Sequence, residues 1–142
     1  MVPKVKKEDN GLSLRLRNSK NIKTRGGYRV FFDLTLSNTT TKNLRVPVIN
    51  KIPIWYMVFD IAGNFVTQSK SRHDTIHVNR SEEIKAKDSL AIELELDDVL
   101  PSGDYKIVIG VGELKQKDNF KLNDSYWTGS ISAWSSIKIE KQ

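Results

Sequence analysis

Apolar side chains recur at every second position along much of this 142-residue chain. The alternation is clearest in residues 11–17, 28–37 and 89–96, where large apolar residues alternate with mostly polar or charged ones. Successive side chains of a β-strand point to opposite faces, so this period gives each strand one apolar face and one polar face. The pattern therefore predicts an all-β fold of short antiparallel strands joined by polar turns.

Three further segments refine this prediction. Residues 54–60, IWYMVFD, are apolar on both faces, which is typical of a strand at the centre of a sheet. Pro47 confines the strand at residues 44–48 to a sheet edge or a bulge, because proline has no N–H group to donate. Residues 79–88 are charged and hold one large apolar side chain, so we interpret them as a charged connection, with a single helical turn as the alternative.

The segment "LPSGDYKIVIGV" contains a turn followed at once by a strand. Pro101 and Gly103 turn the chain, and Tyr105 then opens the strand, where its ring can fill a corner and its hydroxyl can bond back to the backbone. This arrangement resembles the tyrosine corner of immunoglobulin-like and fibronectin type III domains, in which an aromatic residue on the third strand fills the core. Trp55 or Tyr56 would supply that aromatic residue here. The resemblance implies an antiparallel immunoglobulin-like β-sandwich of about seven to nine strands.

A narrower resemblance covers roughly residues 28–112. The order "VFFDLTLSNTTTKNL", "YMVFDIAGNFV" and "LPSGDYKIVIGV" is similar to that in the intracellular proteinase inhibitor family of bacilli. In that family, one strand ends in an Asn-rich turn, the next ends in Asp-x-x-Gly, and a Pro-Gly-x-Tyr corner follows. The resemblance implies a protein that acts by binding, and inhibition of a proteinase is one form that binding can take.

Length and composition favour one domain. We expect a flexible basic arm at residues 1–10 and one sandwich domain at residues 11–142. The absence of cysteine excludes disulfides, thiol catalysis and thiolate metal sites. No apolar stretch is long enough to span a bilayer. Residues 127–140 are similar to the last strand of secreted sandwich domains, which favours the envelope or exterior over the cytoplasm, given an export signal outside this sequence.

The sequence offers no catalytic constellation, cofactor motif or metal site. His73 and His77 lie four residues apart, about 13 Å along a strand, which is too far to share one metal ion. Adjacent carboxylates such as those of Asp97 and Asp98 point to opposite faces of a strand, and a calcium site there is the alternative. The net charge of +6 is spread along the chain without an aromatic-basic signature, so nucleic acid is not the expected partner. We therefore predict a protein that is not an enzyme.

The candidate binding residues are aromatic and basic. The segment between residues 113 and 127 is too long for a simple hairpin turn, and long loops often carry binding residues. We predict that binding uses residues of this loop together with one tryptophan of the last strand: Lys117, Phe120, Lys121, Tyr126, Trp127 and Trp134. Trp134 has the parity opposite to the isoleucines of that strand, so we expect it to face outward. The alternative is that Trp127 and Trp134 close the bottom of the core.

The expected partner is another protein, because exposed aromatic residues dominate binding energy where proteins meet. One function is an interaction or accessory module of a bacterial envelope or secreted system. A second is a protein inhibitor of a proteinase or a toxin. A third is carbohydrate binding by the exposed tryptophans.

Overall fold

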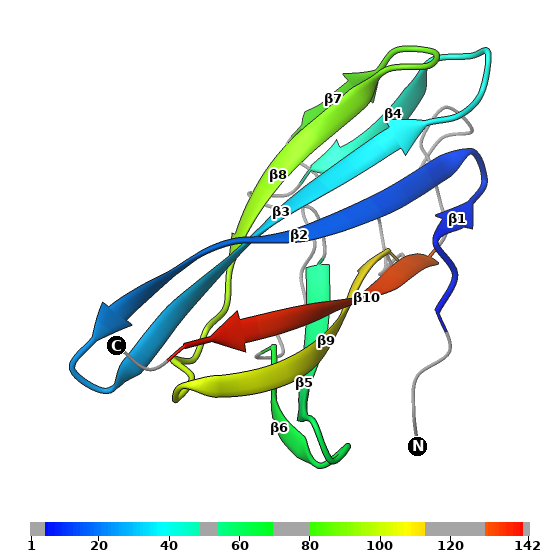
Figure 1. The fold of residues 1–142 in the computed structure, drawn as a ribbon. Helices are drawn as coiled ribbons and strands as arrows, with labels where there is room; N and C mark the ends of the chain where they lie inside the picture. The colour runs from blue at the N-terminus through cyan, green and yellow to red at the C-terminus, as the bar shows by residue number, and fades with distance from the viewer. Residues whose placement is uncertain (1–4, 49–53, 70–79, 113–129, 141–142) are drawn as a thin grey trace, which may run out of the picture.

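The computed structural model describes residues 5–48, 54–69, 80–112 and 130–140, in which β-strands are the only regular elements (Figure 1). The first sheet has the order β1 (Glu8–Asp9), β2 (Leu12–Thr24), β3 (Gly27–Asn38) and β8 (Ser89–Glu95). The second sheet has the order β10 (Ser130–Ile139), β9 (Gly103–Gly112), β5 (Ile54–Asp60) and β6 (Phe65–Gln68). Strands β4 (Leu44–Val48) and β7 (Arg80–Ile84) form a separate pair. All these pairings are antiparallel, so the all-β antiparallel prediction is confirmed.

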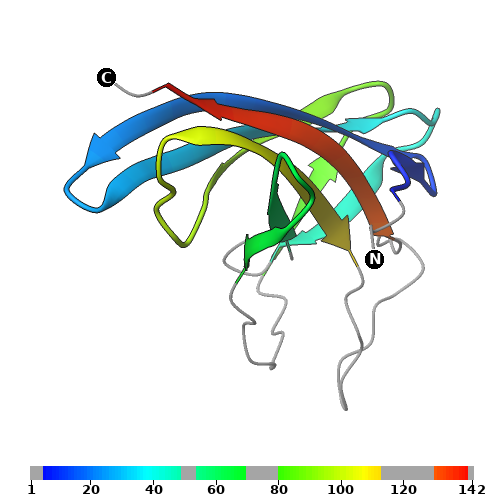
Figure 2. The ribbon, with the colours of Figure 1, turned by 60° about the horizontal axis from the view of Figure 1, so that its bottom comes forward.

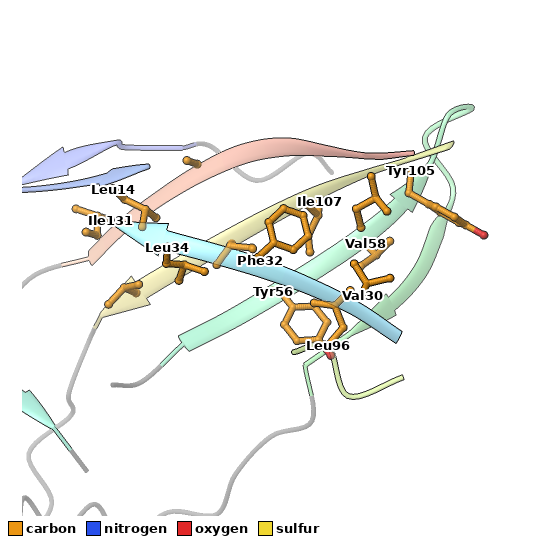
Figure 3. Packing of buried hydrophobic residues seen from close by; sticks show 14 of the residues in the cluster. Leu14, Val30, Phe32, Leu34, Tyr56, Val58, Leu96, Tyr105, Ile107 and Ile131 are labelled. Atoms are coloured by element: carbon orange, nitrogen blue, oxygen red, sulfur yellow. The ribbon is translucent and has the colours of Figure 1, made fainter. Parts of the chain in front are cut away.

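One hydrophobic core lies between the two sheets, which curve around it (Figure 2). Figure 3 shows side chains of both sheets pointing into this space. The central strands β3 and β9 supply many of them from alternate positions: Val30, Phe32, Leu34, Leu36, Ile107, Ile109 and Val111. The period of two in the sequence is therefore the period at which side chains enter the core.

Tyr105 forms the corner between the turn that ends at Gly103 and the body of β9. Its side chain is buried, and its hydroxyl donates a hydrogen bond of 2.9 Å to the carbonyl oxygen of Pro101. Gly103 has a φ of 147°, a conformation that residues with a Cβ rarely adopt. Leu100 connects the same turn to the first sheet. Its N–H donates to the carbonyl oxygen of Tyr28 at 2.9 Å, and its carbonyl oxygen accepts the N–H of Tyr28 at 2.8 Å. The corner thus links both sheets at one end of the core.

The aromatic residue of β5 that fills the core is Tyr56, whereas Trp55 lies on the opposite face of the strand. The Tyr56 hydroxyl accepts the backbone N–H of Asp97 at 2.7 Å and donates to Asp97 Oδ2 at 3.2 Å. Burial raises the pKa of Tyr56, and the nearby carboxylate of Asp97 also favours the neutral phenol. Of the two candidates for the core aromatic, Tyr56 takes that position and Trp55 does not. The sequence could not decide between them, because a strand that is apolar on both faces does not reveal which parity faces inward.

The interpretation of residues 79–88 as a charged connection or a helical turn is wrong for residues 80–84. They form strand β7, which pairs with β4 so that Pro47 lies in a two-stranded ladder, as its lack of an N–H permits. Ile84 at the end of β7 is buried in the core. The Asn38 side chain holds this strand end in place, since its amide nitrogen donates to the carbonyl oxygens of Ile84 and Lys42 at 2.9 and 2.7 Å.

Strands β2 and β10 approach one another along one side of the sandwich (Figure 1). The backbone N–H of Ser132 in β10 donates to the carbonyl oxygen of Lys6 at 2.8 Å. Farther along, the side-chain amide of Asn21 donates to the carbonyl oxygen of Lys138 at 3.3 Å. Part of the segment expected to be a loose arm, residues 5–9, therefore contacts β10 and pairs with β2 through β1.

Replacing Tyr105 by Phe should lower the free energy of unfolding by about 1 kcal/mol, because the corner loses one hydrogen bond whose acceptor residue is partly reached by water. Chemical denaturation at equilibrium measures the effect. Tyr28→Phe is the matched control, since both tyrosines are 8% exposed while the Tyr28 hydroxyl makes only a long contact of 3.5 Å with Glu140. Equal losses in the two variants would show that the Tyr105 hydrogen bond adds nothing specific.

Candidate functional site

The outer face of the second sheet carries large apolar side chains on all four strands. The strand pairings place these residues in adjacent rows, because Trp134 lies opposite Val108, Val108 lies opposite Met57, and Phe59 lies opposite Phe65. We call this surface the aromatic face and define it by the outward-facing residues Trp55, Met57, Phe59, Phe65, Val108, Gly110 and Trp134.

Three rings form a continuous line across the aromatic face. Phe59 lies at the centre, with ring centroids 5.7 Å from Trp134 and 6.2 Å from Phe65. Val108 points to this outer side yet has an exposed fraction of 0%, which shows that neighbouring side chains cover it. The cover is incomplete toward β6, where Phe65 is 55% exposed. The aromatic face is therefore a partly covered apolar surface that ends in an exposed ring.

The indole ring of Trp55 packs against β9 at Gly110. The register pairs these two residues directly, and a Cβ added to Gly110 would collide with the indole ring of Trp55. Gly110 is buried although its side of the strand faces outward. Glycine is required here because the ring occupies the space that any side chain would fill.

A hollow lies beside the line of rings. It has a cavity volume of about 480 Å³ and is lined by Phe59, Trp134, Lys106, Ser135, Ser136 and the turn at residues 60–63. The Asp60 carboxylate is engaged in that turn, where it accepts the N–H of Asn64 at 2.8 Å and the Asn64 side-chain amide at 3.2 Å. These hydrogen bonds hold the pKa of Asp60 below its usual value, the backbone bond from Asn64 most of all. The Asp60 carboxylate therefore stabilises the turn.

The outer face of the first sheet has a different character. Arg17 pairs with Asp33 at 2.6 Å across β2 and β3, and Arg29 pairs with Glu95 at 2.8 Å across β3 and β8. The one large apolar ring on this side, Phe31, is buried beneath two cations: Lys20 Nζ lies 4.8 Å and the Arg29 guanidinium 5.1 Å from its centroid. This face is mostly polar and carries two cross-strand ion pairs, although Ile22, which lies opposite Arg29 on β2, is 39% exposed.

Of the predicted binding residues, the structure places Trp134 on the aromatic face, half-buried and on the side of β10 opposite to the core isoleucines. The predicted loop residues Lys117, Phe120, Lys121, Tyr126 and Trp127 lie outside the described residues, and so do His73 and His77. Phe59, Phe65 and Lys106 were not among the predicted binding residues. Strand β5 is apolar on both faces, so the residues of one parity must form an apolar outer face. That reasoning could have identified Phe59.

The acidic residues that were weighed as a calcium site have other roles. Asp97 binds the Tyr56 hydroxyl, and Asp98 accepts a hydrogen bond of 2.8 Å from the Thr67 hydroxyl. Within the part of the chain that the structure describes, no three His, Asp or Glu side chains gather in a way that could hold a metal ion. The arrangement of the described residues therefore offers apolar contact and one cation in a hollow.

Replacing Gly110 by Ala should lower the free energy of unfolding by about 1–3 kcal/mol, because the new methyl group forces the Trp55 ring off β9. Thermal or chemical denaturation measures the loss. In a Trp55→Ala background, the same Gly110→Ala change should cost much less, since the ring that it meets is gone. Additive effects of the two substitutions would contradict the packing of Trp55 on Gly110.

The comparisons with known proteins identify no family for this chain. No protein-family model matches it, and no curated protein is similar enough to match. Among the residues that the structure describes, none forms a helix of the length and apolarity needed to cross a bilayer.

Proposed function

We propose that this protein is a non-enzymatic binding module with an immunoglobulin-like fold, and that it binds another protein through the aromatic face. The strand orders β2-β3-β8 and β10-β9-β5-β6 support the fold, because they correspond to the A-B-E and G-F-C-C′ orders of immunoglobulin-like domains. The corner at Tyr105 supports it as well, since its hydroxyl bonds to the backbone four residues upstream.

The observation that carries the binding proposal is the contrast between the two outer faces. Among the described residues, the outer face of the first sheet carries two ion pairs and a buried ring, Phe31, whereas that of the second sheet presents a line of three rings. An apolar surface that remains in water costs free energy, so contiguous exposed patches of this kind commonly mark interaction sites. Trp, Phe and Met are also enriched at the centres of protein interfaces.

The geometry of the rings favours a protein over a carbohydrate. The plane of Phe59 is tilted by 49° from that of Trp134 and by 77° from that of Phe65. A sugar stacks on a flat ring face, and a chain of sugars needs several rings in similar orientations. Tilted rings form a corrugated apolar surface, which suits interdigitating side chains.

Two protein-binding roles fit this proposal: an accessory module of a bacterial envelope or secreted system, and an inhibitor of a proteinase or a toxin. Both would use the same face, and the identity of the partner separates them. Recovery of envelope components would support the first role. Recovery of one proteinase or one toxin, with loss of its activity on binding, would support the second.

Replacing Trp134 by Ala should weaken partner binding by about 2 kcal/mol or more, as truncation of a central aromatic residue does. The free energy of unfolding should fall by less than the roughly 3–5 kcal/mol expected for a core tryptophan, because Trp134 lies outside the core cluster. The test is a pull-down from an extract of the source organism, followed by measurement of affinity for the recovered protein.

The matched control is Arg17→Ala, which alters the polar outer face of the first sheet and should leave binding unchanged. Equal recovery of the partner by the Trp134→Ala protein and the unmodified protein would refute the assignment of the aromatic face as the binding surface.

A further inference from the structure

We propose that the hollow beside Trp134 recognises an acidic side chain that neighbours an apolar one on an extended segment of the partner protein. This inference rests on the proposed function, since it uses the same face, and it adds the chemistry of the partner. It follows from the position and the electrostatic surroundings of Lys106.

Lys106 is the cation of the hollow. It lies on β9 between Ser136 of β10 and Phe59 of β5, and its side chain is exposed to solvent. The carboxylate in the lining of the hollow, that of Asp60, is engaged by Asn64 in the turn. None of the ion pairs found among the described side chains includes Lys106. Its ammonium group is thus available to a carboxylate brought by a partner.

The apolar part of the hollow lies next to this cation. Trp134 and Phe59 form its walls, and Ile61 at its rim is 64% exposed. An aliphatic or aromatic side chain placed between the rings would leave water and contact both of them. A partner that brings an apolar and an acidic side chain would contact both the rings and the ammonium group of Lys106.

The spacing of the two features fits an extended segment. Trp134 is the diagonal neighbour of Lys106, because Lys106 pairs with Ser136 two residues farther along β10. Diagonal neighbours in an antiparallel pair lie about 7–8 Å apart. Residues i and i+2 of an extended chain lie on the same side, about 6.6–6.8 Å apart. A partner residue of type Asp or Glu, two positions from an apolar residue, would therefore meet both features at once.

The test uses the full chain and a displayed library of random linear peptides as the probe. The unmodified protein should enrich peptides in which Asp or Glu lies two positions from Leu, Ile, Met or an aromatic residue. The Lys106→Glu protein should enrich peptides with Lys or Arg at the acidic position, because the charge of the hollow is reversed. An acidic preference that persists in the Lys106→Glu protein would overturn the inference.

The matched control is Lys106→Met, which keeps an unbranched apolar stem and removes the charge. It should weaken the binding of a selected peptide by up to about fivefold, the range expected for an exposed ion pair, and reduce the dependence of its affinity on salt. Unchanged affinity and salt dependence in this variant would also contradict the inference.

Two further outcomes separate this inference from the proposed function. Peptides that require Trp134 and show no preference for acidic residues would refute the inference and leave the aromatic face as the binding surface. Enrichment that survives Trp134→Ala would refute both. Sedimentation of the protein alone adds a third check, because a dimer that dissociates on Trp134→Ala would mean that a second copy fills the hollow and that the inference is wrong.

Discussion

The cover of strand β9 on both of its faces is the constraint on which the rest of the structure depends. Its inward residues Ile107 and Ile109 enter the core, and its outward residues Val108 and Gly110 are buried as well. A strand with two apolar faces needs two layers of cover. The first sheet supplies one layer, and the side chains of the aromatic face supply the other. The candidate site is therefore part of what keeps the central strand out of water.

This arrangement explains why the two outer faces of the sandwich differ. In the first sheet, the outward positions hold paired charges such as Arg17 and Asp33, and water completes the cover. In the second sheet, the rings of Phe59 and Trp134 lie against each other above β9, so part of their own surface faces solvent. A partner that covers these rings would gain the free energy of burying that surface without reorganising the strands below.

Much of the fold could be predicted from the sequence, because a period of two has a single structural meaning along strands such as β3 and β8. The position of Tyr105 followed from the proline and glycine before it. Strand β7 could not be recognised, since its charged residues acquire strand structure only through pairing with β4. The choice between Trp55 and Tyr56 depended on register, which a strand that is apolar on both faces does not encode. Of the aromatic face, only Trp134 was predicted as a binding residue. Phe59 was not, because its ring meets that of Trp134 through the pairing of strands that are distant in the chain.

The contacts of Lys6 and Asn21 with β10 have a consequence for the behaviour of the protein in concentrated solution. Strand β10 lies at the edge of the second sheet, and an edge strand with unpaired backbone groups can recruit a strand from another molecule. Here the N–H of Ser132 and the C=O of Lys138, near opposite ends of the strand, are already bonded within the chain. These two bonds hinder the growth of an intermolecular sheet along β10. The residues before β1 and strand β2 thus protect this sheet edge against pairing with another molecule.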